Sequence, residues 1–380
     1  MQSFDVTKGL GSKFWEVIGG EIESVCDAAD FPPSSTDRQL HDSIESVIRE
    51  QIQIELWKLG FMGMEERANP ANATLLSVCY SPSLRRWCAV GQTDGIDTYI
   101  VCSSDGVTWT THAAPANVTA YKVIWSERVR LFIAVGDASG GDAYIMTSAI
   151  GIGGWTERAN PLNENLFSVC ESDELRLFVA VGFNGGILTS PDGITWTLQA
   201  SPSGLTSLRG VAWGKKPGVF VALDSTISPV QMIVSPDGIN WTRITVPCAA
   251  PPYSIEYSKY SDRFVASNFL GTTYLSLFMF SDDGYNWRWT AQASVTKSGY
   301  RLKSFLVFPH IDLIVGLSNA SRMFFYFSNN DGDVAYVVPG FGQGKQDLLG
   351  IAFSIEQKRI VAVGNADGTD AFIMTMNFGV

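Results

Sequence analysis

The sequence predicts an all-β protein, and within that class a seven-bladed β-propeller, from three observations. The 380 residues include 36 glycines and 12% aromatic residues but only 17% charged residues, which is typical of a globular chain with many strands joined by tight turns. A unit of roughly 45 residues recurs along most of the chain. The last unit lacks its fourth strand, and a matching strand stands before the first unit.

The repeated unit carries four short strands. The segments LLSVCYS, RRWCAVG and TYIVCSSDGVTWT, which begin at Leu75, return from Leu166 as LFSVCES, RLFVAVG and GGILTSPDGITWT. The first strand is expected seven times, at residues 76–81, 121–125, 167–172, 208–213, 254–258, 303–308 and 349–354. The second strand ends each time in a small or turn-forming residue, at Gly91, Gly136, Gly182, Asp224, Asn268, Gly316 and Gly364. This spacing fits propeller blades and is too long for tetratricopeptide or ankyrin repeats.

The turn between the third and fourth strands is nearly identical in four units, as SSDGVTW, SPDGITW, SPDGINW and SDDGYNW. Ser and Asp side chains can bind the turn's own backbone, Gly supplies a positive φ, and Trp fills the space between neighbouring blades. The predicted structural residues of these turns are Asp105, Trp109, Asp192, Trp196, Asp237, Trp241, Asp283 and Trp287. The second and sixth units, with SAIGIGGW and SNNDGDVAY, are degenerate copies.

The ends of the repeat region predict how the ring closes. The last unit stops at residues 373–376 and NFGV, before any fourth strand. GMEERANPANATLLSVC, from Gly63, matches GWTERANPLNENLFSVC, from Gly154, so residues 64–67 correspond to a fourth strand with no third strand before it. We therefore expect residues 64–67 to pair with residues 371–375, which leaves no open edge in the ring. The propeller domain would span residues 63–380.

The motif S-x-D-G-x-x-W resembles the Asp-box of the sialidase-type and related bacterial-neuraminidase-repeat propellers, across residues 63–380. The family pattern has one more residue between Asp and Gly, so this motif is a shortened variant. The resemblance implies a propeller and, for some members, action on glycans. Sialidases also need an arginine cluster and an RIP-like strand near the start of the propeller. Neither occurs before or within the first unit, so sialidase activity is not expected.

Residues 1–62 do not belong to the repeat, and they predict a small α-helical segment. Pro32–Pro33 followed by Ser34, Ser35 and Thr36 is typical of a break and then a helix N-cap. The helix that follows would have one apolar face, formed by Leu40, Ile44, Val47, Ile48, Ile52 and Leu56. Two interpretations remain open: the segment packs on its own propeller, or it docks on another protein or self-associates. A propeller already has a complete core, which favours docking.

The composition of the chain argues against several classes of binding partner and of chemical site. A net charge of −11 and a pI near 4.8 argue against nucleic acid or an anionic membrane surface as partner. We expect neither a signal peptide nor membrane insertion, since no stretch approaches 18 uncharged apolar residues. The six cysteines form no CxxC pair, so no disulfide framework is expected. Three isolated histidines, with neither HExxH nor G-x-S-x-G, predict no metal site, no cofactor and no catalytic residues.

One set of acidic loops stands out from this background. The segments GQTDGIDTYI, GDASGGDAYI and GNADGTDAFI lie between the second and third strands of the first, second and seventh units, which are neighbours in a closed ring. Their carboxylates form a predicted polar contact surface, made of Asp94, Asp97, Asp137, Asp142, Asp367 and Asp370. Binding of a cation or a glycan is the functional interpretation. The alternative is that each Asp only caps its own hairpin turn.

The sequence therefore favours a non-enzymatic structural or interaction protein. Its concrete form is a bacteriophage virion component, a tail protein or a capsid-attached fibre or adaptor, because a docking helix before a rigid, acidic propeller resembles phage proteins that display such a module. In the virion, residues 1–62 would contact other virion proteins and the chain would form a homo-oligomer or join a larger assembly. The propeller would meet a host glycan or receptor. Outside a virion, a soluble cytoplasmic protein is expected.

Two other functions remain open. One is a carbohydrate-binding or glycan-cleaving propeller, because Asp-box folds often act on glycans and the face of the ring offers a concave site. The other is an assembly factor resembling the photosystem-assembly propellers, which use a similar box.

Overall fold

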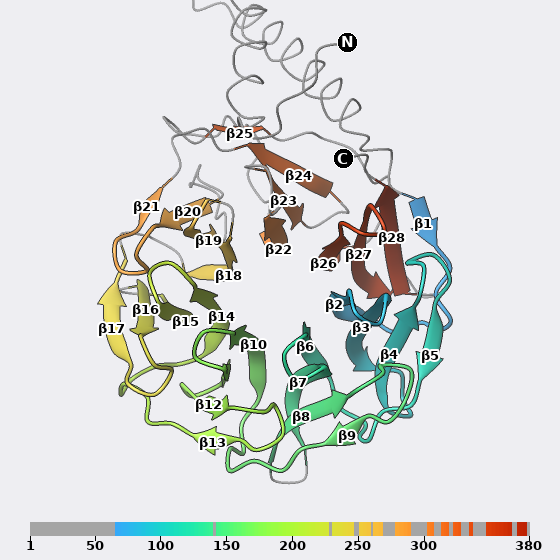
Figure 1. Ribbon diagram of the computed structural model, residues 1–380, viewed down its shortest axis with the longest axis horizontal. Coiled ribbons are helices and arrows are strands. Elements are labelled where there is room, and N and C mark those ends of the chain that lie inside the picture. The colour runs from blue at the N-terminus through green and yellow to red at the C-terminus, as the bar shows by residue number, and fades with distance from the viewer. Residues whose placement is uncertain are drawn as a thin grey trace, which may run out of the picture.

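The computed structural model describes residues 65–139, 142–227, 230–246, 251–259, 261–268, 278–289, 302–307, 313–318, 322–327, 334–336, 347–366 and 371–377. These residues form seven four-stranded antiparallel sheets, and we call each sheet a blade. The sheets are arranged as a ring, with one edge of each sheet toward the centre and the other at the periphery (Figure 1). The all-β propeller predicted from the repeat is confirmed. The predicted helical segment, residues 1–62, lies outside the described residues.

In six blades the four strands follow one another in the chain from the centre outward, and in the seventh the outermost strand is β1. The innermost strands are β2 (Leu75–Ser81), β6 (Ala120–Ser126), β10 (Leu166–Ser172), β14 (Leu208–Gly214), β18 (Pro252–Ser258), β22 (Leu302–Val307) and β26 (Leu348–Ser354). The second strands are β3 (Arg86–Thr93), β7 (Leu131–Ser139), β11 (Leu177–Gly182), β15 (Val219–Ile227), β19 (Arg263–Asn268), β23 (Leu313–Ser318) and β27 (Arg359–Ala366). The third strands are β4 (Thr98–Ser103), β8 (Asp142–Ser148), β12 (Ile187–Ser190), β16 (Val230–Ser235), β20 (Phe278–Ser281), β24 (Arg322–Phe327) and β28 (Ala371–Asn377). The outermost strands are β5 (Thr110–His112), β9 (Thr156–Glu157), β13 (Thr197–Leu198), β17 (Thr242–Thr245), β21 (Arg288–Trp289), β25 (Val334–Tyr336) and β1 (Glu65–Arg67).

The ring closes where the sequence predicts. β1 pairs antiparallel with β28, with Glu66 opposite Met374, so the last blade takes its outermost strand from the start of the described chain (Figure 1). The Arg67 Nε donates a hydrogen bond to the Thr375 hydroxyl across this pair, at 2.7 Å. Because β28 gains a neighbour on its outer side, the third strand of this blade is covered as in the other six.

The core lies between the blades rather than inside any one of them. Between the last and the first blade, Trp87, Tyr99 and Val101 pack against Val361 and Val363 in one buried cluster. Similar clusters join the first blade to the second, the second to the third, the third to the fourth, and the fourth to the fifth. Each of the first four blades thus buries both of its faces against neighbours, which explains why strands with little hydrophobic alternation still form sheets.

The Ser-x-Asp-Gly-x-x-Trp turns have the structural role that the motif predicts. In the turn after β16, the Asp237 Oδ1 accepts hydrogen bonds from the backbone N–H of Ile239 and Asn240, at 2.9 and 2.7 Å. Gly238 has φ +74°, and the Trp241 Nε1 donates to its carbonyl at 3.0 Å. A Cβ on Gly238 would lie 2.8 Å from Leu177 and 3.2 Å from Val179 of the preceding blade. The turn therefore needs glycine both for its backbone and for contact between blades.

The turn carboxylates make stability depend on pH. Although burial raises it, the pKa of Asp237 is lowered overall to about 2, chiefly by the hydrogen bonds from Asn240. Because its folded-state pKa lies below the unfolded-state value near 4, the ionised Asp237 carboxylate stabilises the fold above about pH 4. This stabilisation is lost as the pH falls toward 2. We expect Asp237→Ala to cost about 1 kcal/mol at pH 7. In urea unfolding, the difference in the free energy of unfolding between the variant and the parent chain should shrink between pH 4 and pH 2. A difference that stays constant would contradict this role.

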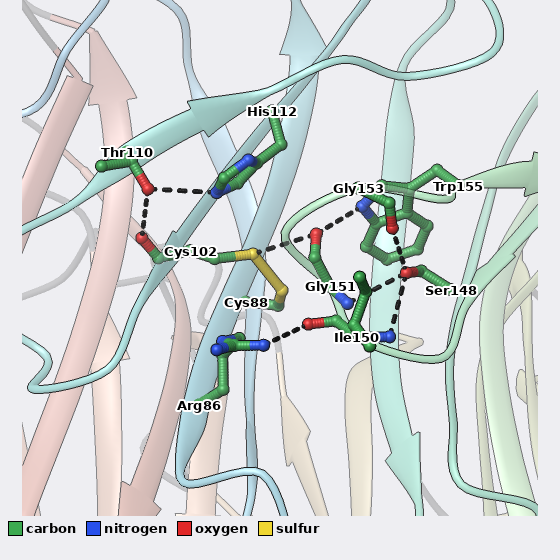
Figure 2. The surroundings of a disulfide bond; sticks show 10 residues. All are labelled: Arg86, Cys88, Cys102, Thr110, His112, Ser148, Ile150, Gly151, Gly153 and Trp155. Atoms are coloured by element: carbon green, nitrogen blue, oxygen red, sulfur yellow. Dashed lines mark hydrogen bonds between the residues drawn. A yellow bond between two sulfur atoms is a disulfide. The ribbon is translucent and has the colours of Figure 1, made fainter.

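One disulfide corrects the sequence expectation. Cys88 and Cys102 are bonded, and they are direct cross-strand partners in β3 and β4, with Cα atoms 4.4 Å apart (Figure 2). The expectation rested on the lack of a CxxC pair, but two residues 14 positions apart can face each other once a hairpin forms. Next to this bond, Arg86 donates to the Ile150 carbonyl of the following blade at 2.6 Å (Figure 2). Cys79 and Cys170 are free.

Candidate functional site in the central channel

The innermost strands enclose a cavity on the axis of the ring. Its volume is about 880 Å³, and residues from all seven innermost strands line it. The seven strands run in the same direction, so their first residues meet at one mouth of the cavity and their last residues at the other. A mouth of a propeller channel is a common place for a ligand, because several blades can contribute side chains to it.

Each innermost strand begins with the same irregularity. In the first blade Leu75 pairs with Gly91 and Ser77 pairs with Val90, so the residue between them has no partner on β3. The other six blades show this shift at the equivalent place. Such a bulge redirects a side chain out of the regular sheet. The bulge residues whose side chains the structure describes all line the cavity, and we call this end the bulge mouth: Leu76, Tyr121, Phe167, Arg209, Tyr253 and Leu349.

The small residues at the end of the second strands make room for these bulges. A Cβ on Gly91 would lie 1.9 Å from the backbone oxygen of Thr74. The same oxygen accepts a hydrogen bond from the N–H of Gln92, at 2.9 Å. Gly136, Gly182 and Gly364 have equally close contacts with a backbone oxygen, at 2.0, 1.9 and 2.1 Å. The glycine pattern in the sequence therefore reflects a close approach of two backbones at the bulge mouth.

The bulge mouth combines aromatic rings with an exposed cation. The rings of Tyr121 and Phe167 lie 5.3 Å apart, and the Arg209 guanidinium lies 4.3 Å from the centre of the Phe167 ring. Stacking on a ring holds the guanidinium in place without using its N–H donors. Among the described residues no acceptor binds Arg209, so its donors face the mouth. Tyr253, on the next blade, is 47% exposed.

One of the predicted acidic residues reaches this mouth. Asp137 lies on β7 directly after Gly136, the partner of the residue before the bulge on β6, and its carboxylate lies against the Tyr121 hydroxyl. Burial, and after it the contact with Asp137, raises the pKa of Tyr121 above its ordinary value. Tyr121 therefore stays neutral at physiological pH and can donate a hydrogen bond.

The acidic loop of the first blade binds backbone N–H groups with both of its carboxylates. The Asp94 Oδ1 accepts from the N–H of Ile96 and Asp97, at 2.9 and 3.2 Å. The Asp97 Oδ2 accepts from the N–H of Ala114, at 2.9 Å. The Asp94 contacts match the turn-capping alternative, whereas Asp97 joins its loop to the segment after β5. The Asp142 side chain and residues 367–370 lie outside what the structure describes, so the three-loop contact surface stays a prediction.

An ion pair crosses the channel between its two mouths. The Lys122 Nζ lies 3.6 Å from the Glu256 Oε1, and both side chains line the cavity. Lys122 belongs to β6 and Glu256 to β18, and β10 and β14 stand between them on the shorter side of the ring (Figure 1). The pair lies between the first and the last residues of the strands, within the one cavity that opens at both mouths.

The described part of the cavity lining contains no arrangement typical of nucleophilic catalysis. Cys79 and Cys170 line it, but burial raises the pKa of both thiols above the ordinary value, which disfavours the reactive thiolate. His112, on the outermost strand β5, binds the Thr110 hydroxyl at 3.0 Å and does not line the cavity. Within the described ranges no group of three or more His, Cys, Asp or Glu side chains could hold a metal ion, and no helix could span a bilayer.

Sequence reasoning missed the bulge mouth because its residues differ from blade to blade. The acidic loops attracted attention because three of them share a pattern, whereas the bulge position holds Leu, Tyr, Phe, Arg, Tyr, Lys and Leu in turn. The available signal was this contrast: one variable position lies inside a strand whose other positions repeat. In repeat proteins, variation at one equivalent position often marks the binding face.

Comparison with known proteins supports the fold and goes no further. No family model and no curated protein sequence matches the chain. Among solved structures, the propeller is similar to one described as YCF48 bound to D1 peptide, with a TM-score of 0.61 and 14% identity over 84% of this chain and 98% of that one. It is also similar to streptogramin B lyase, with a TM-score of 0.63 and 12% identity over 84% of this chain and 99% of that one. These similarities establish that the chain has a β-propeller fold.

Proposed function

We propose that this protein is a binding propeller that receives a segment of a partner protein at the bulge mouth. The observation that carries the proposal is the bulge at the start of each innermost strand, because the six bulge side chains that the structure describes all line a single opening. Tyr121, Phe167 and Tyr253 offer aromatic surface, and Arg209 offers unpaired donors. Aromatic residues and arginine contribute most of the binding energy at protein interfaces. The similar structure of YCF48 with a D1 peptide supports a peptide as ligand.

The wider setting that we propose is a virion. Residues 1–62 would dock on another virion protein and the propeller would face outward, as expected of a bacteriophage tail or capsid-attached protein. This proposal rests on the sequence features of residues 1–62 and on the acidic propeller. A glycan is the alternative ligand, because aromatic side chains at an open mouth can also stack on sugar rings.

An array of random 12-residue peptides, probed with the full chain, tests the proposal. We expect a subset of peptides to bind, and the double variant Tyr121→Ala/Phe167→Ala to bind them at least about tenfold more weakly. The control is Ile194→Ala/Ile239→Ala, which removes two exposed side chains from turns at the opposite end of the blades and should bind like the parent. Equal binding by both variants, or binding to a glycan array in place of the peptides, would refute a peptide site at the bulge mouth.

A further inference from the structure

The last residues of the innermost strands form an aromatic ring at the other end of the channel. The sixth residue of the strand is aromatic in five of the seven blades, and all five side chains line the cavity. We call this end the collar mouth and define it by these residues: Tyr80, Trp125, Trp213, Tyr257 and Phe353. They are half-buried, so each keeps part of its surface open to the channel.

The collar rings are held in place from behind. Trp213 lies 4.5 Å from Phe220 and Trp125 lies 4.6 Å from Phe132, between ring centres. Tyr80 and Tyr257 pack in the same way on the second-strand rings of their own blades, at 4.7 and 5.1 Å. These contacts fix the rings before any ligand arrives, so a ligand would not have to order them.

The polar tips of three collar rings are already occupied at the rim, whereas the buried Trp125 Nε1 has no hydrogen-bond partner among the described residues. The Trp213 Nε1 donates to Glu174 at 2.8 Å, and the Tyr80 hydroxyl donates to Glu356 at 3.1 Å. The Tyr257 hydroxyl accepts from the N–H of Lys216, at 3.2 Å. Trp213, Tyr80 and Tyr257 therefore offer ring surface rather than hydrogen-bonding groups to a ligand.

Charge at this end favours a cation. Three carboxylates line the cavity here, on Glu127, Glu171 and Asp173, against one amine, on Lys259. Glu171 is paired with Arg128 at 2.8 Å. Glu127 accepts a hydrogen bond from the Ser83 N–H at 3.1 Å, and although burial raises its pKa, this bond and its other contacts lower that pKa overall and keep it ionised. Glu127 and Asp173 are therefore the carboxylates that we expect to meet a ligand. Aromatic faces carry partial negative charge and attract cations, so the rings and these carboxylates favour the same kind of group.

We propose that the collar mouth binds a positively charged side chain, lysine or arginine, from a segment of a partner protein. The site differs from the bulge mouth, because the collar residues are the sixth and the bulge residues the second in each innermost strand, at opposite ends of one cavity. The long aliphatic part of such a side chain would lie along the rings, and its charged end would approach Glu127 and Asp173. The proposal does not depend on what the bulge mouth binds.

Fluorine NMR of the full chain labelled with 5-fluorotryptophan tests this proposal. The probes are the peptides Gly-Ser-Arg-Ser-Gly and Gly-Ser-citrulline-Ser-Gly, which differ in charge and barely in shape. We expect the arginine peptide to shift the resonances of Trp125 and Trp213, which are assigned with Trp125→Phe and Trp213→Phe. The citrulline peptide should need at least about a fivefold higher concentration to produce the same shift.

Variants separate the collar from the rest of the channel. Tyr80→Leu/Tyr257→Leu should abolish the shifts, and Glu127→Gln/Asp173→Asn should weaken binding about threefold to tenfold and reduce its dependence on salt. Tyr253→Leu, at the bulge mouth, is the control and should leave the titration unchanged. Equal responses to the two peptides, shifts that survive the collar variant, or no shift up to about 10 mM peptide would each overturn the proposal.

Discussion

A chain that lacks residues 1–68 is expected to unfold about 5 °C below a chain that lacks only residues 1–62. The two truncations differ by the segment that contains β1, the outer neighbour of β28. Loss of the ladder between these strands removes a few hydrogen bonds, each worth about 1 kcal/mol net. It also exposes the edge of β28, so the shorter chain should aggregate more readily.

Differential scanning calorimetry and light scattering measure these two effects. Because both truncated chains lack residues 1–62, the comparison isolates the closing strand. Equal unfolding temperatures would mean that β1 contributes nothing to the closed ring. The chain that lacks only residues 1–62 also tests the docking proposal, since it should form smaller oligomers than the full chain if those residues mediate assembly.

Gly182→Ala is expected to destabilise the propeller by about 3 kcal/mol, although it adds a single methyl group. The new Cβ would lie 1.9 Å from the backbone oxygen of Asn165, which is closer than any two such atoms can approach. That oxygen also accepts a hydrogen bond from the N–H of Phe183, at 2.8 Å. The start of β10 would have to move away from β11, and the hydrogen bond would be lost with it.

Urea unfolding of Gly182→Ala beside Gly95→Ala measures this effect. Gly95 has φ +99° and nothing within 4 Å of its Cβ position, so alanine there should cost about 1 kcal/mol through backbone conformation alone. A larger cost at Gly182, where the strain comes from a steric contact and not from the backbone conformation, would identify the close approach as the cause. Equal costs would contradict it.

Most of the fold could be predicted because each blade repeats the same local chemistry. The turn with Ser235, Asp237 and Gly238 satisfies its own backbone, so the motif alone is enough to predict it. The pairing of residues 65–67 with β28 followed from one missing strand and one surplus strand. Both inferences depend on order along the chain, which sequence comparison within the repeat reveals directly.

The features that were missed depend on which residues face each other across strands. The Cys88–Cys102 bond requires the register of the hairpin between β3 and β4, and spacing along the chain does not supply it. The collar requires knowing that the sixth residue of each innermost strand turns toward the axis. Tyr80 and Trp213 look like ordinary core residues in the sequence, and only the closed ring brings them around one opening.

The bulge at the start of each innermost strand lets recognition change separately from stability. Leu76 lies between two paired residues but has no partner of its own on β3, so replacing its side chain leaves the strand ladder intact. The same holds for the equivalent position in every blade. A new set of side chains at this position could give the same ring a new ligand at little cost in folding. An engineer could therefore treat the bulge mouth as a set of exchangeable positions on a constant scaffold.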